Sequence, residues 1–234
     1  MIIQHSNDGS FGSGVLIDSN TVLTAAHVVR AEQGFKQAMV NFAQIGTEFD
    51  TSEPFRMIDK VIVHPNHQMN QDYYCEGVDL AILKFSEPIL DIAPVKLYSA
   101  AIKDNTQGYI VGYGAGGKSN IGKTDDAHIR GMGTTRISKS EGNYLAYNFD
   151  PLLHQPNMVP STFKVTQTTD KLQSLPSGRD SGGPFLLGKG SDLSVAGIAH
   201  GGSVFYDQET DSIPGATFKW IAIKPHLEWI RANM

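Results

Sequence analysis

The sequence predicts an all-β fold, because short apolar segments separated by Gly, Asn, Asp and Pro recur from one end of the 234-residue chain to the other. Long stretches with helical apolar periodicity are absent, which argues against alternating strands and long helices. With 40% hydrophobic residues the chain is long enough to bury a large core, either as one domain or as two half-domains.

The predicted strands follow from these apolar segments in chain order. The first six are Val15–Ile17, Thr21–Leu23, Ala38–Phe42, Met57–Val63, Leu80–Phe85 and Tyr109–Gly112. The next five are Tyr144–Phe149, Thr162–Gln167, Pro184–Leu187, Val195–Ala199 and Ala216–Ile221. Two helical segments are predicted, a short turn at Ala25–Val28 and a tail from about Lys224, where Pro225 suits a first turn.

Composition limits the classes of partner. The net charge of -5 comes from 24 acidic and 19 basic residues, and neither sign forms a long run. This composition argues against nucleic acid as a binding partner. No apolar run approaches the roughly 20 residues needed to cross a bilayer, and the N-terminus lacks a signal-like core. No membrane partner is therefore expected, and both a cytoplasmic and a secreted location stay open.

The single cysteine, Cys75, excludes an intramolecular disulfide. We expect it to be structural or incidental, and a thiol nucleophile is the alternative. His64 and His67 lie three residues apart, but one turn offers too few ligands for a metal ion. Neither a metal nor a cofactor is predicted.

The strongest functional motif is the run Gly-Arg-Asp-Ser-Gly-Gly-Pro at residues 178–184. It places Ser181 on a tight, glycine-flanked turn where backbone N–H groups can face a reacting carbonyl. A serine hydroxyl is a weak nucleophile unless a base takes its proton, so the run predicts a histidine and a carboxylate elsewhere. His27, which follows Thr-Ala-Ala, and Asp79, which opens an apolar run, are the candidates.

These three segments, in the order His27, Asp79 and Ser181, resemble the chymotrypsin/trypsin-like serine peptidases. Other parts of that family's pattern recur in the correct order: the strand and turn before the aspartate, the mid-chain Gly-Trp-Gly strand, the last strand and the closing helix. The matching segments are Val61–Pro65, Gly112–Gly114, Pro214–Thr217 and Leu227–Ile230. Val28 and Ser177 stand where disulfide-bonded members carry cysteine, so the chain is more similar to a disulfide-free, bacterial-type branch.

The resemblance implies two six-stranded antiparallel Greek-key barrels with the active site between them and a C-terminal helix. Residues 1–115 would form the first barrel, with His27 and Asp79, and residues 116–234 the second, with Ser181. The two barrels would make one peptidase domain that hydrolyses a protein or peptide substrate through an acyl-enzyme. His27 would take the proton of Ser181 and return it to the leaving amine, while Asp79 would hold the required tautomer.

The resemblance assigns the oxyanion hole to the backbone N–H groups of Arg179 and Ser181, and the family usually has glycine at the first of these positions. The Arg179 side chain either points to solvent while its N–H still donates, or disfavours the necessary backbone angle. A serine endopeptidase and a restrained or inactive protein-binding module are therefore both open. An α/β-hydrolase esterase is excluded by the order of the three residues and by the arginine.

Asp180 pairs, in activated zymogens of that family, with a newly cleaved N-terminal amine. Here only 13 residues precede Gly14, and no Ile-Val-Gly-Gly start is present. We therefore expect Asp180 to have an internal partner, without cleavage at this N-terminus.

The resemblance also locates the pocket for the residue before the scissile bond. Its expected lining is Leu175, Ser177, Gly178, Ala199, His200, Gly201, Gly202 and Gly215. Leu175 stands where members that cut after Lys or Arg carry an acidic residue, and an apolar floor cannot compensate a buried cation. We predict an apolar or small residue at this position of the substrate; His200 offers an alternative, an imidazole that binds an acidic side chain.

Overall fold

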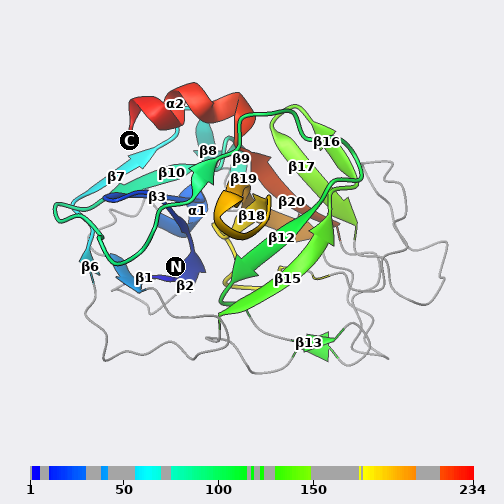
Figure 1. The fold of residues 1–234 in the computed structure, drawn as a ribbon, viewed down its shortest axis with the longest axis horizontal. Helices are drawn as coiled ribbons and strands as arrows, with labels where there is room; N and C mark the ends of the chain where they lie inside the picture. The colour runs from blue at the N-terminus through cyan, green and yellow to red at the C-terminus, as the bar shows by residue number, and fades with distance from the viewer. Residues whose placement is uncertain are drawn as a thin grey trace.

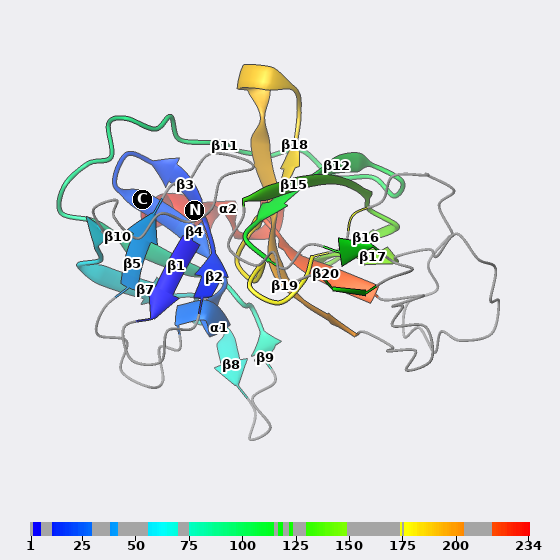
Figure 2. The same ribbon diagram turned by 90° about the horizontal axis from the view of Figure 1, so that it is seen from below.

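The computed structural model describes residues 2–5, 11–29, 38–41, 56–69, 75–114, 117–118, 122–123, 130–148, 174, 176–203 and 217–234. Within these ranges the chain consists mainly of strands, which form curled sheets in two halves that lie side by side (Figures 1 and 2). Short helices complete the described part of the fold. The predicted all-β class is confirmed.

The first half contains two four-stranded antiparallel sheets. One has the order β2-β1-β5-β6, with β1 (Ile2–His5), β2 (Phe11–Ser13), β5 (Ala38–Asn41) and β6 (Arg56–Met57). The other has the order β3-β4-β10-β7, with β3 (Val15–Asp18), β4 (Thr21–Thr24), β7 (Lys60–Val63) and β10 (Ala81–Lys84). A hairpin of β8 (His67–Met69) and β9 (Cys75–Gly77) precedes β10.

The second half is built on one eight-stranded sheet, in which the antiparallel order is β15-β12-β18-β19-β20-β17-β16 and β11 pairs in parallel with β19. Its strands are β11 (Lys96–Leu97), β12 (Gln107–Gly112), β15 (Gly131–Arg136), β16 (Lys139–Glu141), β17 (Tyr144–Asn148), β18 (Pro184–Leu187), β19 (Ser194–Ser203) and β20 (Thr217–Ala222). A separate pair consists of β13 (Gly117–Lys118) and β14 (Gly122–Lys123).

The division predicted between residues 115 and 116 lies outside the described residues. The division therefore stays a prediction. The strands β11 and β12, which precede it in the sequence, pair with strands of the second half.

Most of the predicted strands are present, with shifted ends. The segment 57–63 is divided between β6 and β7, whereas β12 and β19 extend beyond the predicted Tyr109–Gly112 and Val195–Ala199. The predicted strand Thr162–Gln167 lies outside the described residues. Strands such as β15 were not predicted, because the Gly-Met-Gly-Thr-Thr-Arg segment has no apolar run.

Two hydrophobic cores correspond to the two halves. The strand β10 lies between β4 and β7 in its sheet, and its first three residues are buried, which explains a continuous apolar run in place of alternation. The second core surrounds Trp220, whose ring centroid lies 5.6 Å from that of Phe185 and 5.5 Å from that of Phe218. Ile198 of β19 and Ile221 of β20 belong to the second half but pack into the first core, so the halves share apolar contacts.

Both predicted helical segments are confirmed. The short helix α1 (Ala26–Val29) follows β4, and the tail forms a 3₁₀ turn (Lys224–His226) followed by α2 (Leu227–Ala232). The tail returns to the first half, where the ring of His64 lies 5.0 Å from that of His226 and 4.6 Å from that of Trp229 (Figure 1). No helix in the described ranges has the length and apolar character to cross a membrane.

The buried histidine of this tail predicts acid sensitivity. Burial, with a contribution from His64, lowers the pKa of His226 from 6.5 to about 4. The folded chain therefore keeps His226 neutral where the unfolded chain protonates it, so stability present above pH 6.5 is lost as the pH falls towards 4. We expect a lower urea midpoint at pH 5 than at pH 7 in unfolding followed by tryptophan fluorescence.

The control is His226→Gln, which keeps a polar side chain but does not titrate. Its midpoints at the two pH values should lie closer together than those of the wild-type protein. An equal difference in both proteins would contradict the assignment to His226.

Candidate active site

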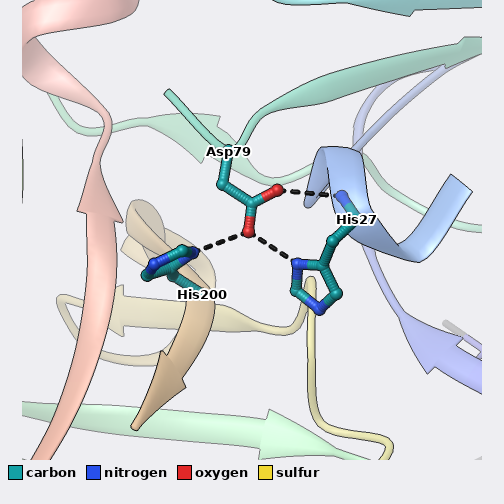
Figure 3. A group of neighbouring side chains, drawn as sticks. All are labelled: His27, Asp79 and His200. Atoms are coloured by element: carbon teal, nitrogen blue, oxygen red, sulfur yellow. Dashed lines mark hydrogen bonds and ion pairs between the residues drawn. The ribbon is translucent and has the colours of Figure 1, made fainter. Parts of the chain in front are cut away.

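Asp79 and His27 meet in the structure, as predicted. Asp79 lies directly before β10 and is fully buried, and His27 lies in α1, directly after β4. Asp79 Oδ2 lies 2.6 Å from His27 Nδ1, and Oδ1 accepts the backbone N–H of His27 at 2.9 Å (Figure 3). Because β4 and β10 are paired neighbours, with Ala81 opposite Thr24, their ends bring the two residues together.

The Asp79 carboxylate is ionised despite its burial. Burial by itself would raise the pKa of Asp79, but the hydrogen bonds from His200 and His27 outweigh it and hold the pKa well below its usual range. The negative charge fixes the proton of His27 on Nδ1 and leaves Nε2 as the nitrogen that can accept another proton. The His27 side chain is 28% exposed, whereas that of Asp79 is fully buried.

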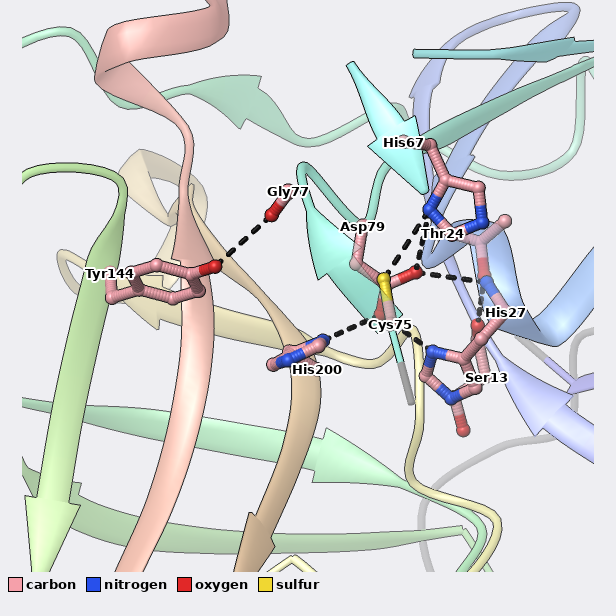
Figure 4. Close-up of polar contacts among 9 residues, drawn as sticks. All are labelled: Ser13, Thr24, His27, His67, Cys75, Gly77, Asp79, Tyr144 and His200. Atoms are coloured by element: carbon pink, nitrogen blue, oxygen red, sulfur yellow. Dashed lines mark hydrogen bonds and ion pairs between the residues drawn. The ribbon is translucent and has the colours of Figure 1, made fainter. Parts of the chain in front are cut away.

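Ser181 lies in the turn before β18, and hydrogen bonds from Ser13 link this turn to the first half. The Ser13 N–H donates to the carbonyl oxygen of Ser181 at 2.7 Å, and the Ser13 hydroxyl donates to the carbonyl oxygen of Arg179 at 3.0 Å. The carbonyl oxygen of Ser13 accepts the Thr24 hydroxyl at 2.7 Å (Figure 4). Since Thr24 ends the strand that precedes His27, Ser13 connects the His27 segment directly to the turn that carries Ser181. No pattern in the sequence indicated this role of Ser13.

The second half holds the other side of the turn through β19. The N–H of Gly182 donates to the carbonyl oxygen of Ala199 at 2.8 Å, and the N–H of Ala199 donates to Gly183 at 2.8 Å. Gly182 has φ of 80°, and a side chain there would collide with the Ser13 carbonyl oxygen and the Thr24 hydroxyl. The turn is thus fixed from both halves, although the Ser181 hydroxyl and the described ring of His27 are not hydrogen-bonded to each other.

Arg179 adopts a backbone conformation that favours glycine. Its φ is 83°, and among the described residues Asn105 is the one other non-glycine residue with positive φ. An L-residue in this region costs about 1–2 kcal/mol relative to glycine. The side chain is exposed.

Asp180 has partners within the chain, as expected, whereas the expectation about cleavage at the N-terminus stays a prediction. Its Oδ1 accepts the N–H of Gly114 at 2.7 Å, and its Oδ2 accepts the N–H of Ser177 at 2.8 Å. Burial raises the pKa of Asp180, and these hydrogen bonds only partly oppose the increase. The Ser177 hydroxyl also donates to Oδ2, at 3.4 Å, so backbone amides and one hydroxyl hold this carboxyl.

The glycines in the described part of the expected pocket differ in the free space around them. Within the described residues, a side chain at Gly178 or Gly201 would meet no neighbour, whereas one at Gly202 would collide with the carbonyl oxygen of Thr217. The Ala199 side chain is buried in the second core. Leu175 and Gly215 lie outside the described residues, so the floor of the pocket stays a prediction.

His200 faces Asp79, a contact that sequence reasoning missed. Its Nδ1 lies 2.7 Å from Asp79 Oδ2, the same oxygen that contacts His27, and the rings of the two histidines lie 6.4 Å apart (Figure 3). The sequence predicts His200 to line the substrate pocket. The structure adds a direct contact with the carboxylate.

Tyr144 supports this side of the site. Its ring centroid lies 6.1 Å from that of His200, and its hydroxyl donates to the carbonyl oxygen of Gly77 at 3.0 Å (Figure 4). Burial, followed by the charges of Cys75 and Asp79, raises the pKa of Tyr144, so the hydroxyl remains a donor. The contact joins β17 of the second half to the segment that ends at Asp79.

Two groups of potential metal ligands occur among the described residues, and Asp79 belongs to both. The first consists of His27, Asp79 and His200, and the second of His67, Cys75 and Asp79. His64 does not join His67, because its Nδ1 accepts the N–H of Asn66 at 3.2 Å and its ring faces the C-terminal tail.

Comparison with known proteins agrees with this geometry. The family described as trypsin matches residues 1–226. Chymotrypsin-like elastase family member 1 is similar both in Homo sapiens, with 30% identity over 106 residues, and in Rattus norvegicus, with 26% over 120 residues. These matches cover 43% and 48% of this chain but only 40% and 44% of the relatives' length. Because the family match extends over nearly the whole chain, the protein belongs to the trypsin family of serine peptidases.

Proposed function

We propose that the protein is a serine endopeptidase that forms an acyl-enzyme at Ser181. The observation that carries the proposal is the buried, ionised Asp79 at 2.6 Å from His27 Nδ1, because this contact prepares Nε2 of His27 to act as a base. The fixed, glycine-flanked turn supplies the serine that such a base would activate.

In the proposed mechanism, His27 takes the proton of the Ser181 hydroxyl as the oxygen attacks the scissile carbonyl. Asp79 stabilises the imidazolium that forms, and His27 then returns the proton to the leaving amine. Water attacks the acyl-enzyme by the same route. The N–H groups of Arg179 and Ser181 are the proposed donors to the tetrahedral oxyanion, each worth on the order of 3 kcal/mol. Asp180, held by backbone amides, needs no N-terminal amine in this proposal.

We further propose that the substrate residue before the cut is apolar or small. Leu175 would form an apolar floor, and among the described residues a side chain at Gly178 or Gly201 would meet no neighbour. The matched relatives are elastases by name, and elastase is associated with a small pocket at this position. Lys and Arg would be disfavoured, because an apolar floor leaves their charge without a partner.

A restrained protein-binding module is the second candidate. The observations that favour it are the strained backbone of Arg179 and the lack of a hydrogen bond between the described Ser181 hydroxyl and His27. Catalytic hydrogen bonds are often longer in the absence of substrate, so the peptidase remains the better-supported function.

Covalent labelling separates the two candidates. At pH 8 a serine-directed phosphonate should label the wild-type protein once, at Ser181, with the site identified by mass spectrometry. Ser181→Ala should lose both the label and, by about six orders of magnitude in kcat, peptide hydrolysis. Cleavage of proteome-derived peptides should show apolar or small residues before the cut. A profile dominated by Arg, Lys or Glu would refute the proposed substrate preference. Absence of labelling would support the binding module.

Arg179→Gly should relieve the backbone strain. The matched control is Arg179→Ala, which removes the same guanidinium but keeps a Cβ at positive φ. After allowance for the greater flexibility of glycine in the unfolded chain, the glycine variant should exceed the alanine variant in free energy of unfolding by about 0.5–1 kcal/mol. Equal urea midpoints would refute the strain, and hydrolysis slower in the glycine variant than in the wild-type protein would refute the expected donor geometry.

We propose that His200 is a positioning residue that acts through Asp79. His200→Asn keeps an N–H near the position of Nδ1, whereas His200→Leu removes the donor and leaves the buried carboxylate less satisfied. The leucine variant should lose about 10–100-fold in kcat with KM nearly unchanged, and the asparagine variant should recover most of that loss. A change confined to the cleavage of substrates with acidic residues would instead assign His200 to the pocket.

A further inference from the structure

The hairpin β8–β9 brings three possible metal ligands together at one edge of the site. Cys75 Sγ lies 3.3 Å from His67 Nδ1, and His67 Nδ1 lies 4.0 Å from Asp79 Oδ1 (Figure 4). All three donor atoms lie within 4.8 Å of one another. The pairing of Met69 with Cys75 and of His67 with Gly77 holds the two strands in this register.

The spacing of these atoms suits a tetrahedral zinc ion. Zinc bonds of about 2.3 Å to sulfur and about 2.0–2.2 Å to nitrogen or oxygen place neighbouring ligands roughly 3.3–3.6 Å apart. The two separations from His67 Nδ1, 3.3 and 4.0 Å, lie within a few tenths of an ångström of these values. The third pair, Cys75 Sγ and Asp79 Oδ1, lies within 4.8 Å and would have to close on the ion. In the other ligand group, both histidine nitrogens lie at 2.6 and 2.7 Å from one Asp79 oxygen, which are hydrogen-bond distances and too short for two ligands of one ion.

The chemistry of the donor set agrees with the spacing. A thiolate, an imidazole and a carboxylate form a borderline set that zinc prefers over calcium or magnesium. The thiolate and the carboxylate together would neutralise the two positive charges of the ion. The side chains of His67 and Asp79 are 8% and 0% exposed, so the ion would occupy an environment in which this compensation is strong.

We propose that His67, Cys75 and Asp79 form a zinc-binding site whose occupation inhibits the peptidase. The sequence predicted no metal because it paired His67 with His64, whereas the fold pairs it with Cys75 and Asp79. Inhibition rests on the proposed function: an ion on Oδ1 would take up negative charge that otherwise stabilises the imidazolium of His27. A water molecule would complete the coordination.

Binding should be reversible. Nε2 of His67 is buried and has no hydrogen-bond partner among the described residues. Coordination through Nδ1 places the ring proton on Nε2, and a ligand histidine without a partner for its second nitrogen typically loses affinity by about 10–100-fold. The site is therefore a regulatory one that a chelator can empty, unlike a structural zinc site.

The test uses the full chain and two independent readouts. Zinc added to the wild-type protein should suppress peptide hydrolysis, and EDTA should restore it. Cobalt, used as the spectroscopic probe, should give a near-ultraviolet thiolate charge-transfer band. Cys75→Ser and His67→Gln should lose the band and should need at least about tenfold more zinc for half-inhibition, each relative to its own metal-free activity.

His200→Asn is the matched control, because it alters the other ligand group and should keep the cobalt band. Far-ultraviolet circular dichroism checks that each variant is folded, and Cys75→Ala replaces Cys75→Ser if the serine variant is not. Absence of the band in the wild-type protein, equal inhibition of Cys75→Ser, or loss of the band in His200→Asn would overturn the site. A band that depends on Cys75 in a protein without hydrolytic activity would retain the site and reject the peptidase function.

Discussion

The structure of the site depends on one buried carboxylate. Asp79 is shielded from solvent, so its charge must be compensated by donors from the protein. Those donors come from both halves: His27 follows β4 of the first half, and His200 lies in β19, in the middle of the eight-stranded sheet of the second half. The charge can therefore be stabilised only when the halves are correctly aligned. The contact from Tyr144 to the carbonyl oxygen of Gly77 crosses the same boundary.

The position of the turn that carries Ser181 also depends on the alignment of the two halves. Ser13 holds it from the first half and Ala199 from the second, so neither half alone determines where the serine lies. This network also explains how Arg179 can remain in a conformation that glycine prefers, since local strain persists where the surrounding bonds outweigh it. Asp180 adds further restraint through the amides of Gly114 and Ser177.

The two oxygens of Asp79 have different surroundings, and this difference separates the proposed catalytic and regulatory roles. Oδ2 contacts the ring nitrogens of His27 and His200, whereas Oδ1 accepts the backbone N–H of His27 and faces His67. A ligand on the Oδ1 side can alter the charge without displacing either imidazole. Regulation through Asp79 would therefore act on the electrostatics of the site and leave the substrate cleft open.

The sequence by itself determined the all-β class, most strand positions and the pairing of His27 with Asp79. Apolar runs and the glycine-flanked serine turn are local patterns, so they are visible without coordinates. The tertiary structure decided the φ of Arg179 and the hydrogen bond from Ser13 to the turn that carries Ser181. It also decided the contacts of His200 with Asp79 and of Cys75 with His67. These features depend on strand register or on contacts between the halves, and a one-residue change of register turns a side chain to the opposite face of a sheet.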